Sequence, residues 1–301
     1  MPDIIRGLAE SSVRTSTGLP TDQDLQTDTV TIPVKLCNLP PFNAIANQVL
    51  ALSADPDIDL KRLASVMEGD PAFAAEVLLL ANSSLFGFTS KMQVLRHAVA
   101  VLGLDRIKAL AVTVAMRAFL GASAGGVLIR QCWRHSAACA IIAEEISPVF
   151  DFSGDRAYTM ALMHDVGRLG LLKSYAPDIT PVLESEHANL EALFQAERNA
   201  VNVDHGTAGA WMVSNWSFPD DFAEICAHHH DPMQPSDAPL LKVVKTSCRM
   251  ASALGNAAVR FRSPATYAEV IQSLPPHLRR QFADESELRH NVERRLTALE
   301  R

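Results

Sequence analysis

The residues with the greatest chemical potential in this sequence are a His-Asp pair, His164-Asp165, set in a mainly apolar run from Ala161 to Arg168. Imidazole and carboxylate groups are poorly tolerated in apolar surroundings without a partner, and a divalent metal ion is a common partner for that combination. Seven of the ten histidines lie between residues 135 and 230. The candidate metal ligands that accompany the pair are His135, His205, His229 and His230.

These donor types suit a divalent first-row metal such as iron, manganese or zinc. Such an ion could lower the pKa of a bound water molecule and neutralise the charge of a phosphate during hydrolysis. A lone histidine is more often a packed or hydrogen-bonded residue than a ligand, so the prediction depends on several donors meeting in space. His97 has no acidic or histidine neighbour at i+3 or i+4 and is predicted to be structural. The same role is predicted for three histidines in polar stretches: His187, His277 and His290.

The spacing of apolar residues predicts that helices position these side chains, and no strand alternation competes with this pattern. Helices are expected near residues 127–147, 155–172, 189–199, 205–215, 219–229, 238–256 and 284–300. His164 and Asp165 would then point about 100° apart on one helical turn, so that a cation between them could bind both. His205 would begin a helix, and His229 and His230 would lie at the end of another.

The chain divides into four predicted segments. Residues 1–27 are rich in Ser, Thr, Asp and Gly and are expected to form a flexible arm. Residues 28–121 are predicted as an N-terminal helical subdomain that ends at the small residues of Gly121–Gly126. A helical core over 127–256 carries the candidate ligands, and residues 257–301 are predicted as a C-terminal helical extension.

Composition narrows the class of protein. The 301 residues are 48% hydrophobic and 20% charged, which allows a large core. A net charge of −7 argues against binding nucleic acid through a broad basic surface.

The five cysteines have no C-x-x-C spacing and no signal segment opens the chain, so a cytoplasmic location is expected. Charged residues interrupt the apolar runs, so no membrane-spanning helix is predicted. The oligomeric state stays open.

An ordered series of motifs resembles the HDOD family, the HD-related output domain of bacterial signalling proteins. The matching segments are Asn38–Phe42, Leu78–Ser83, Ala98–Gly103, Trp133–Ser136, Leu162–Gly167, Asp204–Gly209, Trp216–Pro219 and His229–Pro232. This resemblance implies an all-α fold in which an N-terminal helical bundle packs on an HD-type helical core.

The catalytic relatives of this family, the HD phosphohydrolases and HD-GYP phosphodiesterases, close their metal shell with a late aspartate. The resemblance places Ser247 and Cys248 there, and a thiolate in place of a carboxylate changes the charge and the ion preference. Gln131 stands where those relatives have a glutamate, and Asp231–Pro235 lacks their Gly-Tyr-Pro segment. Arg168 stands where many HD enzymes have a lysine, which makes it a candidate for phosphate binding or for a simple ion pair.

These departures favour a non-catalytic signalling module that acts on an unidentified protein partner. The alternative is a metal-dependent phosphohydrolase or cyclic-nucleotide phosphodiesterase with an incomplete shell. A third hypothesis is a vestigial pocket that senses a nucleotide or phosphate without cleaving it.

Overall fold

The computed structural model describes residues 32–52, 58–83, 85, 91–121 and 126–300. The described residues belong to one compact unit that begins at Ile32. The predicted arm over 1–27 lies outside the described residues, as does most of the Gly121–Gly126 boundary. The limits of the other predicted segments stay predictions.

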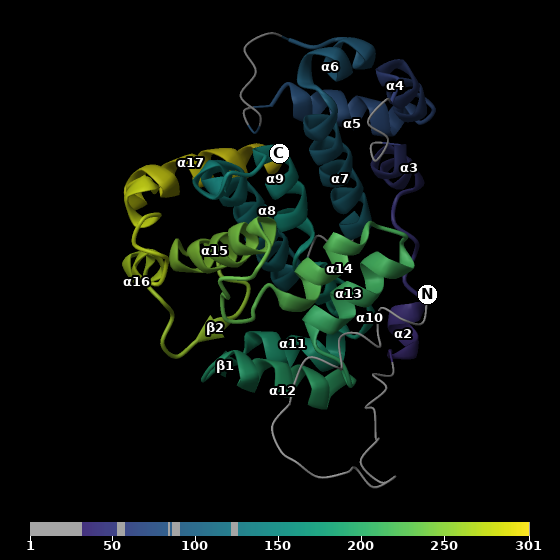
Figure 1. Ribbon diagram of the computed structural model, residues 1–301. Helices are drawn as coiled ribbons and strands as arrows, with labels where there is room; N and C mark the ends of the chain where they lie inside the picture. Colours follow the sequence, from purple (N-terminus) through teal and green to yellow (C-terminus); the bar gives the residue numbers. More distant parts are fainter. Residues whose placement is uncertain (1–31, 53–57, 84, 86–90, 122–125, 301) are drawn as a thin grey trace, which may run out of the picture. The chain divides into compact units, whose positions relative to one another are not determined.

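The described part of the chain is predominantly helical and has almost no strand, as predicted (Figure 1). Helices of the first part are α2 (Val34–Cys37), α3 (Ala44–Leu52), α4 (Leu60–Glu68), α5 (Pro71–Ala81), α6 (Leu95–Leu102) and α7 (Leu104–Leu120). Local chemistry sets their limits. The Asp70 carboxylate accepts hydrogen bonds from the first free amides of α5, and Pro71 occupies the first turn, where a missing N–H costs nothing.

The second part carries the candidate ligands. Its helices are α8 (Val127–Ile146), α9 (Gly154–Met163), α10 (Val166–Ser174), α11 (Ala176–Glu184), α12 (Leu190–Val201), α13 (His205–Asn215), α14 (Asp220–His228) and α15 (Pro239–Ala253), followed by α16 (Tyr267–Gln272) and α17 (Glu285–Leu299). Two short 3₁₀ helices, η2 (Ser147–Phe150) and η3 (Arg279–Gln281), complete the helical elements. Most helices of this half begin and end within three residues of the predicted limits. Within the described residues, no helix combines the length and apolarity that a membrane crossing requires.

The prediction of one continuous helix over 155–172 is wrong. The chain turns at His164 and Asp165, so that α9 ends at Met163 and α10 starts at Val166. The His164 ring itself stabilises this break, because its Nδ1 donates a 2.6 Å hydrogen bond to the Ala161 carbonyl, one of the carbonyls that a helix end leaves free. The pair therefore lies at a junction of two helices and not on one helical turn.

Several short elements are absent from the predicted set, including α2, η2 and η3. The others are α11, α16 and a parallel sheet in which β1 (Glu186–His187) pairs with β2 (Arg260–Phe261). The two strands have two residues each, which is too short for an alternating pattern to be visible in the sequence. Their pairing connects parts of the chain more than 70 residues apart.

Helix packing brings the candidate residues together. Helices α8, α9 and α15 contact one another, and α10 packs on α13 (Figure 1). The α10–α13 contact is unusually close, since a Cβ on Gly167 would lie 2.0 Å from the His205 carbonyl oxygen. Gly167 therefore lets the segment that follows the His-Asp pair lie directly against the start of the helix that bears His205.

Candidate metal centre

The structure brings the five predicted histidines into one continuous buried cluster. Successive ring centroids lie 5.4 Å apart for His135 and His164, 4.8 Å for His164 and His229, and 4.0 Å for His229 and His230. His205 lies 5.1 Å from His230. Four of these residues are buried and His230 is half-buried. The donors form two groups, each with ligand atoms within 4.8 Å of one another.

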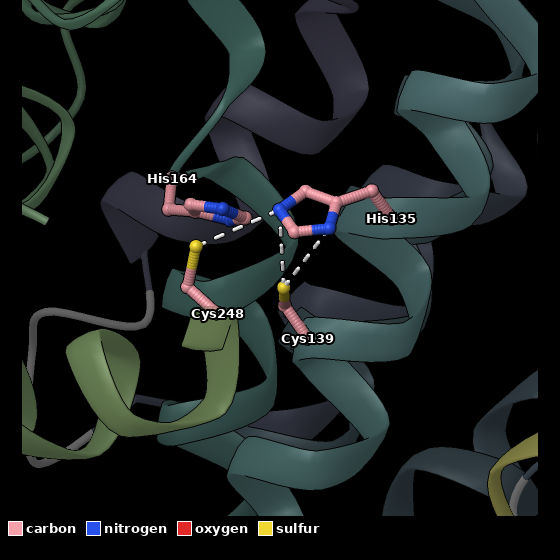
Figure 2. Close-up of side chains that lie close together, drawn as sticks. All are labelled: His135, Cys139, His164 and Cys248. Carbon is pink, nitrogen blue, oxygen red and sulfur yellow. Dashed lines mark hydrogen bonds between the residues drawn. The ribbon is translucent and has the colours of Figure 1, made fainter. Parts of the chain in front are cut away.

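The first group combines His135 and His164 with two cysteines, Cys139 and Cys248, all of them buried. Figure 2 shows the four side chains converging from three segments: α8, the α9–α10 junction and α15. The His135 Nε2 atom lies 3.6 Å from the sulfur of each cysteine. Two nitrogens and two sulfurs thus surround one point inside the helical core.

Backbone carbonyls orient the rings of three histidines. The Nδ1 of His135 donates to the Asn256 carbonyl at 2.7 Å, and that of His229 donates to the Cys226 carbonyl at 2.9 Å. His164 makes the equivalent bond to Ala161. Because a carbonyl can only accept, each Nδ1 carries a proton, and Nε2 is the ring nitrogen left to offer a lone pair.

Two of these lone-pair atoms have no hydrogen-bond partner. Nε2 of His164 and Nε2 of His229 are fully buried and unpaired, as is Nε2 of His230. A buried polar atom without a partner costs free energy, and a bound ion is one of the explanations for it. The orientation of the rings therefore fits metal binding.

The two thiols of the first group differ in the direction in which their surroundings shift the pKa. Hydrogen bonding from Cys139, together with that from His135, outweighs burial and holds the pKa of Cys248 well below its usual value. Burial raises the pKa of Cys139 well above its usual value. Burial also opposes protonation of His164, but its contact with the Cys248 sulfur offsets this effect and raises the pKa of that ring. Cys248 is the sulfur more ready to act as a thiolate.

The second group consists of His205, His229 and His230. Burial lowers the pKa of His230 to about 3 and lowers that of His229 well below its usual value, so both rings are neutral. His205 is held by Glu197, whose carboxylate accepts from its Nδ1 at 2.7 Å and from its backbone amide at 3.0 Å. The remaining ring nitrogen of His205, Nε2, lies 3.0 Å from the Arg168 guanidinium.

Arg168 is buried and paired. Its Nη1 donates to the Asp165 carboxylate at 2.6 Å, and its Nε lies 4.0 Å from the Glu197 carboxylate. The side chains of Arg168 and Asp165 are 3% and 1% exposed. Burial opposes ionisation of Asp165, but the neighbouring guanidinium outweighs it and lowers the pKa of that carboxyl. The contacts of Arg168 are those of an internal ion pair, and its predicted role in phosphate binding stays a prediction.

Three residues of this centre were not among the predicted ligands. Cys139 lies four positions after His135 on the same face of α8, a spacing that could have identified it. Cys248 stood out only as the replacement for an aspartate. Glu197 is fully buried against His205, although nothing in the apolar pattern of α12 separates it from the exposed charges of that helix.

Comparison with known proteins agrees with this fold. The model of the HDOD domain matches residues 39–232. An uncharacterized protein of Treponema pallidum (strain Nichols) is 23% identical over 283 residues, which cover 85% of this chain and 50% of that protein. The chain thus spans about half the length of the curated relative that it matches.

Solved structures of low sequence identity share the fold. An HDOD domain protein with unknown function from Geobacter sulfurreducens has a TM-score of 0.68 at 21% identity, over 87% of this chain and 92% of that one. A protein from Shewanella amazonensis SB2B with a provisional assignment as a phosphohydrolase has a TM-score of 0.67 at 17% identity, over 89% and 96% of the two chains. A protein from Marinobacter aquaeolei VT8, assigned provisionally to signal transduction, has a TM-score of 0.65 at 23% identity, over 95% and 63%. The match of the family model over most of the chain, together with the shared helical fold, shows that this protein belongs to the HDOD domain family.

Proposed function

We propose that this protein is a non-catalytic regulatory module that acts through contact with another protein of a signalling pathway. The observation that carries the proposal is the position of the Arg168 guanidinium, which contacts both Asp165 and His205. A hydrolytic metal ion bound by the Asp165 carboxylate and the His205 imidazole would have to share both groups with the positively charged guanidinium of Arg168. Repulsion between two buried cations a few ångströms apart opposes that arrangement.

The burial of the candidate ligands and the presence of a cysteine among them support the same conclusion. Hydrolysis at a metal centre needs an open coordination position that a substrate phosphate can reach. His135, His164, Asp165 and His205 are each at most 2% exposed. Cys248 offers a soft sulfur at the place where the HD enzymes that the chain resembles have a hard carboxylate. A buried centre of this composition suits stability better than turnover.

One observation favours the alternative of a metal-dependent phosphohydrolase. His205, His229 and His230 place ligand nitrogens within 4.8 Å of one another, and the His230 residue is half-buried whereas the other two are buried. A hydrolytic ion held by these rings is the second candidate function. A nucleotide or phosphate sensor is a weaker candidate, because the cation that would hold the phosphate, Arg168, is 3% exposed and bound to Asp165.

A hydrolysis assay separates these functions. The purified full chain is incubated with cyclic dinucleotides, cyclic mononucleotides and nucleoside phosphates, each with added Fe²⁺, Mn²⁺ or Zn²⁺ under reducing conditions. We expect no turnover above that of the free metal ions. Turnover that disappears in the His164→Ala and Asp165→Ala variants, or in a His229→Ala variant of the second group, with helical circular dichroism unchanged, would contradict the proposal and establish the phosphohydrolase.

The regulatory role is tested in the cell. A strain that lacks the gene is complemented with the wild-type chain or with the double variant Arg168→Met/Asp165→Asn, which removes both charges of the pair together. A regulatory module without catalysis should work with either chain, provided that both accumulate equally. The cytoplasm is the proposed compartment, since all five cysteines are free thiols.

A further inference from the structure

We propose that His135, Cys139, His164 and Cys248 form a closed, structural Zn²⁺ site that ties α8, the α9–α10 junction and α15 together. The four donor atoms lie within 4.8 Å of one another and all four residues are buried. The site is distinct in kind from an open hydrolytic centre, because its four protein ligands leave no coordination position for water or substrate. It goes beyond the regulatory role and does not depend on it.

The distances support tetrahedral zinc. Zinc binds cysteine sulfur at about 2.3 Å and histidine nitrogen at about 2.0 Å, so tetrahedral geometry separates a sulfur from a nitrogen by about 3.5 Å. The His135 Nε2 atom lies 3.6 Å from Cys139 Sγ and 3.6 Å from Cys248 Sγ. The side chains therefore stand close to the positions that a zinc ion would impose.

The backbone supports the same arrangement. The Asn256 carbonyl holds the Nδ1 proton of His135, and the Ala161 carbonyl holds that of His164. Such hydrogen bonds orient the rings of metal-binding histidines and present Nε2 to the ion. The Nε2 of His164 is buried and has no hydrogen-bond partner, which a fourth bond to zinc would correct (Figure 2).

The charge and the softness of the four ligands favour Zn²⁺ over other divalent ions. A cysteine that binds Zn²⁺ releases its thiol proton, Cys139 included, and the two resulting thiolates neutralise the two positive charges of the ion, so that the buried site carries no net charge. Thiolate and imidazole ligands suit zinc, whereas manganese and magnesium prefer carboxylate oxygens. The carboxylate next to His164 in the chain, that of Asp165, is bound by Arg168.

The second group of histidines lies outside the proposed zinc site. His205 Nε2 lies 3.0 Å from the Arg168 guanidinium, which donates to it and adds a positive charge beside any ion. The expected content is therefore about one zinc ion per chain, held by the first group.

The wild-type protein provides the first test. The full chain is produced without a histidine tag, purified under reducing conditions and analysed for zinc, iron, manganese and copper by mass spectrometry. We expect about one zinc ion per chain, with an X-ray absorption spectrum that fits two sulfurs at about 2.3 Å and two nitrogens at about 2.0 Å. Replacement by Co²⁺ should give thiolate-to-cobalt charge-transfer bands.

Cysteine variants provide the second test. Cys139→Ser and Cys248→Ser should each weaken zinc binding by at least about 100-fold in a chelator competition, since loss of a ligand costs more than loss of its supporting partner. Cys132→Ser is the matched control, because Cys132 is a buried free thiol on the same helix outside the group. His205→Gln is the control for the second group. Both controls should retain zinc.

Four results would overturn the zinc site. They are protein that stays metal-free after reconstitution with Zn²⁺, iron or manganese in place of zinc, an absorption spectrum without sulfur ligands, and zinc retained by both cysteine variants. If the variants do not fold, the absorption spectrum of the wild-type protein decides. Failure of the regulatory proposal is recognised separately, as hydrolysis, and neither result implies the other.

Discussion

A methyl group at residue 167 tests the contact that positions His205 against the Asp165–Arg168 pair. A Cβ on Gly167 would lie 2.0 Å from the His205 carbonyl oxygen, 2.4 Å from the Gly209 amide nitrogen and 2.8 Å from the Gly209 Cα. All three atoms belong to the backbone of α13, so no side-chain rotation can relieve the overlap. In the Gly167→Ala variant, α10 and α13 must move apart.

The size of the effect follows from these distances. Ordinary van der Waals contact begins at 3.4 Å, so the helices must separate by about 1.4 Å at this contact, in a core packed as densely as an organic crystal. We expect the overlap to cost about 3 kcal/mol, the upper end of the range for overpacked cores. Alanine has the higher helix propensity by about 1 kcal/mol, which acts in the opposite direction. The net loss of about 2 kcal/mol should lower the Tm by about 3–4 °C, because the entropy of unfolding of a chain of this length is large.

Thermal melts followed by circular dichroism measure this loss. The matched control is Gly170→Ala on the same helix, whose Cβ would meet the Met212 Sδ atom at 2.3 Å. That contact involves the flexible end of a side chain, which can rotate away, so the Tm should change less than in Gly167→Ala. A Gly167→Ala protein that melts at or above the wild-type temperature would refute the reasoning, because propensity would then outweigh the contact.

Three further predictions concern the buried charges, the choice of metal and a helix cap. Arg168→Met should lower the free energy of unfolding by about 3–5 kcal/mol, because it leaves the Asp165 carboxylate buried without its cation. Adding Asp165→Asn should recover part of this loss in urea unfolding, and a double variant that is less stable than Arg168→Met would argue against the ion pair. Cys248→Asp replaces a soft donor with a hard one, so it should shift the preferred metal from zinc toward manganese or iron in a competitive loading experiment. An unchanged preference for zinc would contradict the assignment of Cys248 as a ligand. Asp70→Ala should cost about 1 kcal/mol in the same unfolding assay through loss of the cap of α5, and an unchanged stability would show that this cap contributes nothing.

Local sequence was sufficient for most of the helices. The helix over 205–215 starts and ends where the apolar period predicts, because Asp204 caps its first turn and its apolar residues repeat at helical spacing. The break at His164 could not be predicted from that period. It depends on a side-chain hydrogen bond to the Ala161 carbonyl and on a new packing direction for α10. The two-residue strands depend wholly on a partner distant in the chain.

The sequence by itself determined the donor types of the site, the five histidines and Asp165, because an ionisable pair in an apolar run requires a partner wherever the chain folds. Only the tertiary structure decided which donors share an ion-sized space. It joined Cys139 and Cys248 to His135 and His164, and it directed Asp165 to Arg168. The physical reason is that coordination and ion pairing act over a few ångströms, and those distances are set by how α8, α10, α13 and α15 pack rather than by separation along the chain.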